Sequence, residues 1–234
     1  MKYISCDERG IEVMPPRRKP PARLIITEDD VRVGLKVLRR KCCHIRAMHD
    51  LAGDPPLRRR EPGFEGLARI IISQQVSVAS ANAIWTRFAR AVDPMEAVVV
   101  LAMTDDELRL AGLSRPKVRT LRAISTAVVH DGLRFDQFDE VAEAAVHEAL
   151  TRVSGIGPWT ADIFLLFCLG RADAFAAGDL ALQEAARMAM GLESRPNALE
   201  LLEIAERWRP WRGIAARMLW TYYKAVKERE GVTG

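Results

Sequence analysis

The stretch Gly155-Ile156-Gly157-Pro158-Trp159-Thr160-Ala161-Asp162 lies between two helical patterns, and Asp179 follows on the next loop. Two glycines separated by one apolar residue allow a tight turn, and Pro158 suits the first position of a helix, where its missing N–H costs nothing. Such a turn presents free backbone amides and a positive helix end, which attract a phosphate. A carboxylate beside that phosphate could act on a sugar, so the pattern indicates an enzyme that works on DNA.

Length and composition place the chain among globular proteins. The 234 residues are 49% hydrophobic, enough for one large domain or two lobes around a real core. The net charge of +4 and the sequence pI of about 9.0 favour nucleic acid only mildly. The chain shows no signal peptide and no apolar run of about 18 residues, so no membrane partner is expected. We expect a cytoplasmic monomer.

The basic residues form clusters along the chain, whereas the cysteines form no recognisable motif. Basic clusters lie in a proline-rich tail at residues 1–22, at Arg39–Lys41 and at Arg58–Arg60, and each is as consistent with a solvated face as with a DNA contact. The four cysteines form no C-x-x-C pair, which disfavours an iron–sulfur cluster or a disulfide scaffold.

Helical periodicity dominates the chain from Phe64 onward. Apolar residues recur every three to four positions, and Thr104 to Glu107 forms a capping box. A strand-like run, Val98-Val99-Val100, lies within a helical context. The pattern predicts an all-α protein with many short helices and short connections.

Residues 150–180 carry a family resemblance. They read as a helix, a Ser-Gly-Ile-Gly-Pro hairpin, a second helix and a loop ending in Gly178-Asp179, which resembles the helix-hairpin-helix DNA glycosylase superfamily. Within it, the chain is most similar to the bacterial 3-methyladenine DNA glycosylase II family. Three further stretches agree with that family, at 64–79, 112–121 and 208–220. The resemblance covers about residues 63–225.

The resemblance implies a two-lobed, all-α fold with a DNA-binding cleft between the lobes. Residues 23–76 and 175–234 would form one lobe, and 77–174 the other, with the helix-hairpin-helix at about 141–169. Two departures from the family pattern stand out. The loop Phe175-Ala176-Ala177-Gly178 has Ala176 where members often carry proline, which predicts a looser loop. The extra N-terminal β domain of some members is expected to be absent.

Asp179 is the expected catalytic residue. Breaking an N-glycosidic bond builds oxocarbenium-like charge on the sugar, which a carboxylate in a poorly hydrated cleft stabilises. The same group could position or deprotonate the attacking water. The alternative role is that of an ordinary helix N-cap. Asp162 and Asp173 are expected to be structural.

Position 159 distinguishes two mechanisms. Glycosylase-lyases of the superfamily carry a nucleophilic lysine there, whereas this chain has Trp159. We therefore expect hydrolysis without strand cleavage. Trp159 could offer its π face to an alkylated, cationic purine, an interaction of about 0.5–2 kcal/mol. Trp220 matches another pocket aromatic of the family. The alternative for both is core packing.

The remaining site residues concern the DNA. Gln75, or else Gln74, would fill the gap left by the flipped base, unless both only cap the turn. A phosphate would be bound by the amides of Gly155 and Gly157 and by the side chains of Thr160 and Lys117. The resemblance also implies a monovalent cation, Na⁺ or K⁺, at the carbonyls of the hairpin residues Thr151, Val153 and Ile156. No cofactor is expected to be required.

The expected reaction is hydrolytic excision of an alkylated base, 3-methyladenine or 7-methylguanine, from double-stranded DNA in base excision repair. Two alternatives stay open. The chain could act on an oxidised or mismatched base, or it could be a non-catalytic hairpin module that only binds DNA.

Overall fold

The structure is a computed structural model that describes residues 23–232 of the chain. Within that range it is helical, and an isolated antiparallel bridge joins Leu24 to Arg171. The all-α prediction is therefore confirmed. The basic, proline-rich tail predicted at residues 1–22 lies outside the described residues. No helix within residues 23–232 is both long and apolar enough to cross a membrane.

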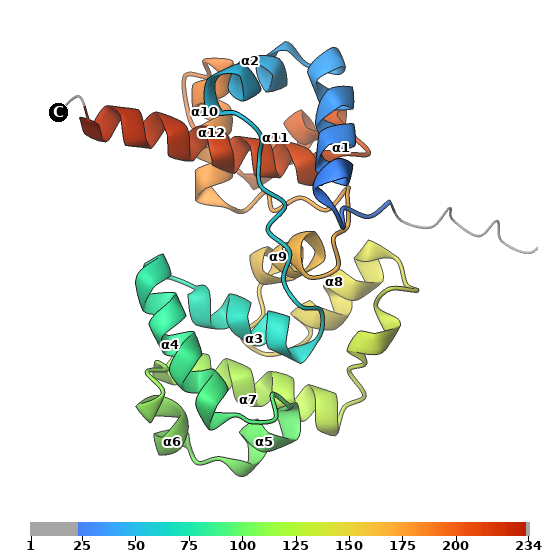
Figure 1. Cartoon of the computed structure of the whole chain (residues 1–234). Helices are drawn as coiled ribbons and strands as arrows, with labels where there is room; N and C mark the ends of the chain where they lie inside the picture. The colour runs from blue at the N-terminus through green and yellow to red at the C-terminus, as the bar shows by residue number, and fades with distance from the viewer. Residues whose placement is uncertain (1–22, 233–234) are drawn as a thin grey trace, which may run out of the picture.

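The helices form two lobes, one above the other in Figure 1. The upper lobe joins the two ends of the described chain, and its central helix α12 packs on α1, α2 and α10. Its members are α1 (Glu28–Lys41), α2 (Cys43–Ala52), α10 (Leu180–Met190), α11 (Ala198–Ala205), the 3₁₀ turn η2 (Glu206–Trp208) and α12 (Arg212–Val232).

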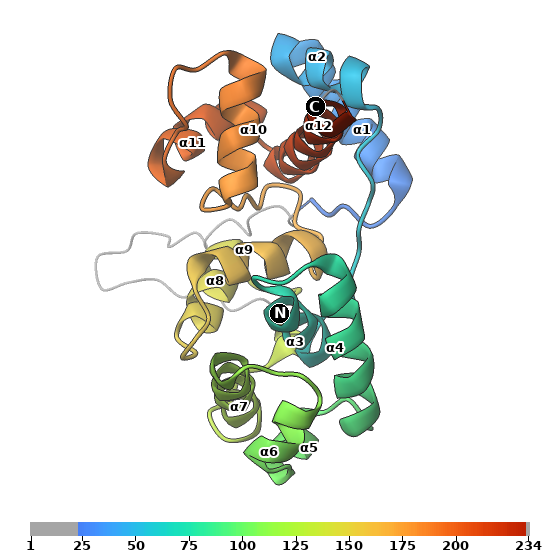
Figure 2. The ribbon, with the colours of Figure 1, turned by 90° about the vertical axis from the view of Figure 1, so that its left-hand side faces the viewer.

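The lower lobe contains the middle of the chain. Helix α3 packs on α4, α7 and α9, and α8 packs on α9. In both views of the ribbon, α4 and α8 lie on opposite sides of α3 (Figures 1 and 2). The members are α3 (Phe64–Ser73), α4 (Val78–Ala91), α5 (Ala97–Ala102), α6 (Asp105–Leu110), α7 (Arg115–Val129), the 3₁₀ turn η1 (Phe135–Gln137), α8 (Glu143–Thr151) and α9 (Pro158–Phe167).

The chain crosses between the lobes earlier than residue 76. The sequence predicts residues 64–76 in the lobe of the terminal helices, but α3 belongs to the lower lobe. The physical reason is its apolar face, which buries Leu67, Ile70 and Ile71 within the lower lobe. The crossing is instead made by the linker at residues 53–63, and the chain returns between α9 and α10.

Arg217 of α12 joins the two lobes at the linker. Its guanidinium is buried and donates to the carbonyls of Leu57 at 3.1 Å, Gly213 at 2.9 Å and Leu166 at 2.8 Å. It also lies 4.9 Å from the ring centre of Phe167. A buried charge is costly unless it is hydrogen-bonded, and these carbonyls satisfy it. The linker, α9 and α12 are therefore held in one fixed arrangement.

Candidate active site

Asp179 is held by hydrogen bonds from two directions. It is the N-cap of α10, where Oδ1 accepts from the amides of Ala181 at 2.9 Å and Leu182 at 3.0 Å. The indole of Trp159 donates to Oδ2 at 2.9 Å, and that of Trp220 donates to Oδ1 at 3.1 Å. Asp179 therefore caps α10, and capping leaves its carboxylate half-buried and bonded to both tryptophans. Its catalytic role stays a prediction.

The loop before Asp179 is anchored although it lacks the family's proline. The amide of Asp179 donates to the carbonyl of Ala176 at 3.0 Å. The buried side chain of Gln183 donates to the carbonyl of Ala177 at 2.9 Å. These bonds, together with the burial of Phe175, Ala176 and Ala177, replace the restraint that a proline ring would supply. The predicted looser loop is therefore not what the contacts show.

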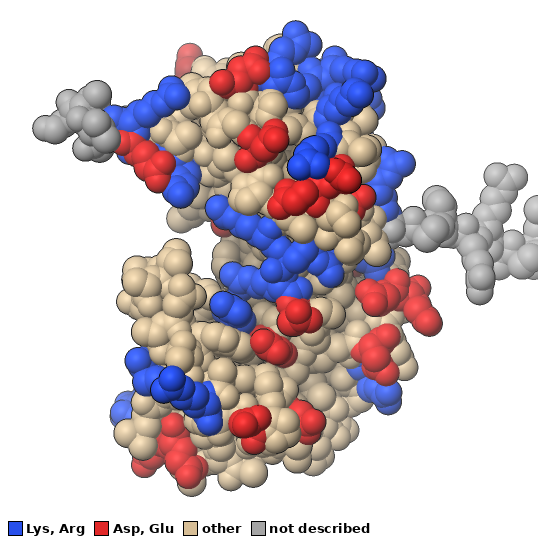
Figure 3. Space-filling view, viewed as in Figure 1, with Lys and Arg blue, Asp and Glu red and all other residues tan. Residues whose placement is uncertain are grey.

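A pocket of about 190 Å³ lies beside the carboxylate, between the lobes. One wall carries Asp179 with its two tryptophans, and Trp220 packs on Phe167 with ring centres 5.6 Å apart. The full lining is Arg58, Arg60, Ile70, Ser73, Trp159, Ile163, Phe167, Asp179 and Trp220. Figure 3 shows the molecule notched at the level where the two lobes meet. The arrangement encloses an aromatic, partly apolar space next to a fixed negative charge.

The glycine hairpin before α9 has the geometry that the sequence predicted. Gly155 has φ +88°, and a Cβ there would lie 2.2 Å from Thr120 Oγ1, so only glycine fits. Gly157 is the N-cap of α9, and nothing lies within 4 Å of its would-be Cβ. In the described part of the chain, neither glycine amide donates to a protein acceptor. These open amides at a helix start suit an anion.

The carbonyls predicted to hold a cation come from the same hairpin. That of Val153 already accepts from the amide of Ile156 at 3.0 Å. A carbonyl oxygen has a second lone pair, so this bond leaves room for a cation. The site at Thr151, Val153 and Ile156 stays a prediction. Elsewhere in residues 23–232, no group of His, Cys, Asp and Glu could hold a metal ion.

Thr160 does not reach the surface of the hairpin. Its side chain is buried, and Oγ1 accepts a hydrogen bond of 2.8 Å from Gln74 Nε2. The hydroxyl is therefore buried against the turn that follows α3, and its contact with a phosphate stays a prediction. The same hydrogen bond holds the side-chain amide of Gln74 against α9. Gln75 is instead exposed, with φ +55°, and is the glutamine that can project into DNA.

Lys117 also has an internal role. Its ammonium donates to the carbonyl of Ile72 at 2.7 Å, in the last turn of α3. A cation is favourable at that negative helix end, and burial lowers the pKa of this lysine. The ammonium therefore braces α7 against α3, and its contact with a phosphate stays a prediction.

The two other aspartates, which the sequence predicts to be structural, lie in ion pairs. Asp173 forms ion pairs with Arg209 and, at 3.1 Å, with Arg212. Asp162, on α9, lies 3.6 Å from Nε2 of His147 on α8. Burial raises the pKa of Asp162 to about 7, against an opposing effect of Arg212. Neither carboxylate lines the pocket of Asp179.

Arg58 and Arg60 line the pocket, although their sequence context did not distinguish them from other basic residues. They belonged to a basic cluster that could equally have been a solvated face. Their position just before the helix that leads to Gln74 and Gln75 was the available signal. Only the folded chain shows that the linker passes the pocket.

Comparison with known proteins gives a consistent result. Residues 68–210 match the family model described as HhH-GPD superfamily base excision DNA repair protein. The "DNA-3-methyladenine glycosylase 1" of Schizosaccharomyces pombe is 31% identical over 172 residues, which is 70% of this chain and 73% of the relative. The "Alkylbase DNA glycosidase-like protein mag2" of the same yeast is 29% identical over 162 residues, covering 67% and 76%.

Two solved structures share the fold. The S. pombe 3-methyladenine DNA glycosylase Mag1 in complex with abasic DNA aligns with a TM-score of 0.73 at 27% identity, over 80% of this chain and 95% of that one. A DNA-3-methyladenine glycosidase from Bacillus halodurans aligns with a TM-score of 0.73 at 28% identity, over 83% and 91%. The arrangement of the two lobes is thus one that solved glycosylases also have.

Proposed function

Because the chain belongs to the HhH-GPD superfamily of base excision DNA repair proteins, we propose that it is a DNA glycosylase that removes alkylated bases from duplex DNA. The relatives named 3-methyladenine glycosylase, at 27–31% identity over most of the chain, support this substrate class. We infer that the chain acts as a monomer, and the position of the hairpin, the pocket and Asp179 in one chain supports this.

The observation that carries the proposal is the carboxylate of Asp179, fixed by two indoles at a pocket between the lobes. A flipped nucleotide would place its sugar beside this carboxylate. The bond between C1′ and the base nitrogen breaks, and its electron pair leaves with the base. Asp179 stabilises the positive charge on the sugar, and water adds its oxygen to C1′ while losing a proton. An alkylated, cationic base leaves as a neutral molecule and needs no acid.

We also infer that the reaction ends at an intact abasic strand. A lyase step needs an amine that forms a Schiff base with C1′. None of the residues lining the pocket in the described structure is a lysine, and Trp159 occupies the position where lyases of the superfamily carry one. Water is therefore the nucleophile, and the product strand should break only after alkali or heat.

The direct test compares the wild type with Asp179→Asn on a methylated duplex. Asparagine is as good an N-cap as aspartate, so α10 keeps its start while the charge is lost. Base release should fall about 10²–10³-fold. The matched control is Asp106→Asn, an exposed aspartate on α6, which should release bases at the wild-type rate.

The outcomes separate the alternatives. Equal release by wild type and Asp179→Asn would remove this residue from the mechanism. No release by the wild type, with DNA binding retained, would identify a non-catalytic binding module. Strand cleavage without alkali would contradict the absence of a lyase step.

A further inference from the structure

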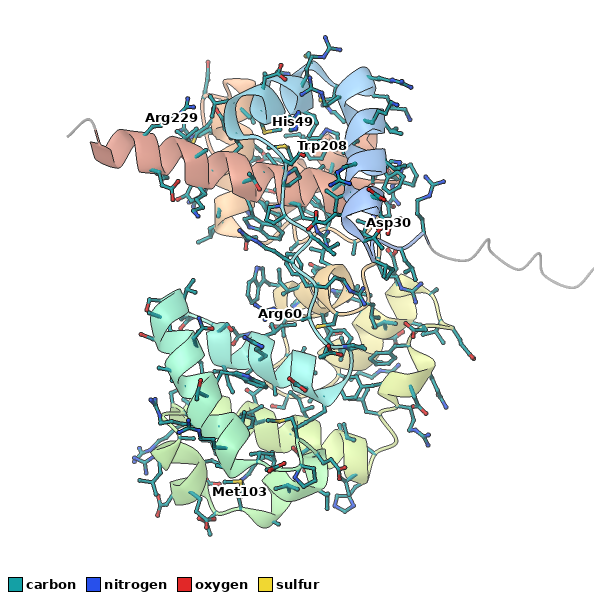
Figure 4. The ribbon with its side chains drawn as sticks, in the orientation of Figure 1. Asp30, His49, Arg60, Met103, Trp208 and Arg229 are labelled. Atoms are coloured by element: carbon teal, nitrogen blue, oxygen red, sulfur yellow. The ribbon has the colours of Figure 1, made fainter. Side chains whose placement is uncertain are left out.

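The pocket has a cationic wall that the proposed reaction does not use. Arg58 and Arg60, from the linker, line the same pocket as Asp179, together with Ser73 at the end of α3. Figure 4 shows Arg60 in the region where the two lobes meet, and Figure 3 shows blue side chains gathered there. The wall stands between this pocket and a second cavity of about 480 Å³, which Arg60 and Ser73 also line.

The linker is fixed on both sides of these arginines. The carbonyl of Leu57 accepts from Arg217 Nε at 3.1 Å. The amide of Arg60 donates to the carbonyl of Phe167 at 2.9 Å. Between these two anchors, Arg58 has φ +50°, a conformation that non-glycine residues rarely adopt. Such a backbone persists only where its surroundings impose it, and it is common at ligand sites. The backbone that carries the two arginines is therefore held in a fixed conformation.

Neither arginine is neutralised by a partner. No carboxylate of the described residues forms an ion pair with Arg58 or Arg60, and one terminal nitrogen of Arg60, Nη1, is buried without a hydrogen-bond acceptor. Burial lowers the pKa of Arg60, the Cys168 thiol opposes this, and Arg69 and Arg58 lower the pKa further. Asp179 lines the same pocket as Arg60, and Glu61 and Glu65 line the second cavity with it. An arginine stays protonated under all ordinary conditions. The wall thus offers charged donors and lacks acceptors.

The other hydrogen-bond donors that line the pocket already bond to acceptors within the protein. The indoles of Trp159 and Trp220 donate to Asp179, and the Ser73 hydroxyl donates to the carbonyl of Arg69 at 2.6 Å. The remaining lining residues, Ile70, Ile163 and Phe167, are apolar. Of the described residues around the pocket, Arg58 and Arg60 are the ones with donors left for a base.

We propose that Arg60, together with Arg58, selects purines that carry an oxygen at C6. The oxygen of 7-methylguanine accepts a hydrogen bond, whereas the C6 amino group of 3-methyladenine is a donor and meets a guanidinium without a bond. Both methylated bases are cationic, so their charge does not distinguish them and the C6 group does. This inference rests on the proposed function and refines its substrate class.

The test measures the two bases released from one batch of methylated duplex. Arg60→Met removes the donors while keeping an unbranched side chain. The ratio of kcat/KM for release of 7-methylguanine to kcat/KM for release of 3-methyladenine should fall by about tenfold. Arg58→Gly accommodates the positive φ without strain and should lower the ratio in the same direction. The matched control is Arg69→Met, on the second cavity, which should leave the ratio unchanged.

Each result has a defined meaning. A melting temperature near that of the wild type shows that a variant is folded. If Arg60→Met does not fold, Arg58→Gly still tests the proposal. An unchanged ratio in the folded variants overturns the selection by the wall and leaves the glycosylase intact. Release of neither base by the wild type overturns the proposed function, and this inference with it.

Discussion

Gln74 donates a hydrogen bond of 2.8 Å through Nε2 to Thr160 Oγ1, which joins the turn after α3 to the first turn of α9. The first of these segments leads to the exposed Gln75, and the second starts at the glycine hairpin. The turn proposed to enter DNA and the turn proposed to bind its backbone are therefore one connected unit.

We expect the bond between Gln74 and Thr160 to stabilise the fold measurably. Thr160→Val keeps the shape of the side chain but leaves the amide of Gln74 without its acceptor, which should cost about 1–3 kcal/mol in the free energy of unfolding. Urea denaturation measures this loss, with the exposed Thr86→Val as control. The same loss from Thr160→Val in a Gln74→Ala background would show that the two residues are not coupled.

The two hairpin glycines should respond differently to alanine. Gly155→Ala should destabilise the fold by about 1 kcal/mol or more, because φ is +88° and the methyl would meet Thr120. Gly157→Ala has open space around it and should change stability by less than about 1 kcal/mol. It should nevertheless weaken binding to a duplex with an abasic analogue, since the methyl stands where a phosphate approaches. Anisotropy titrations check this, and unchanged affinity would argue against a phosphate at the hairpin.

Gln75 should matter for base flipping and not for folding. Gln75→Gly fits the positive φ of 55° and removes the side chain, so the melting temperature should stay or rise. Release of a base from a paired site should fall about tenfold or more, because a plug offsets a flipping cost of a few kcal/mol. Release from an unpaired bulge serves as the internal control and should change little. A matching loss on both substrates would point to a role other than filling the gap.

Asp162 should make stability depend on pH. Its pKa is raised from 3.8 to about 7, so between these values the folded chain binds more protons than the unfolded chain. The free energy of unfolding should therefore fall as pH rises through this window, by up to about 4 kcal/mol in total. Burial is the cause of the raised pKa, and the charge of Arg212 opposes part of it.

The variant Asp162→Asn should remove that slope. It should match the wild type near pH 4 and be more stable than the wild type near pH 8, as measured by urea denaturation at both values. Asp106→Asn, exposed on α6, should follow the wild type at each pH. A difference between Asp162→Asn and the wild type that is the same at both pH values would contradict the assignment.

Much of the architecture could be predicted from the sequence because it depends on local chemistry. Capping residues such as Thr104 and Asn197 start helices through bonds to residues two or three positions away. Gly155 needs its positive φ, and Asp179 caps α10 within the same short segment. The hairpin and the helices therefore followed from the order of the residues, whereas the choice of Asp179 as the candidate catalytic carboxylate followed from the family resemblance.

What the sequence alone could not predict depends on contacts between distant segments. Thr160 and Lys117 look like surface donors in the sequence, but bonds to Gln74 and to Ile72 turn them inward. The linker arginines become a pocket wall because Arg217, 160 residues away from Leu57, holds the chain there. By itself the sequence determined the helices, the glycine turn and the placement of Asp179 after it. The tertiary structure decided which donors remain free to meet DNA, because a donor is free only if folding supplies no acceptor for it.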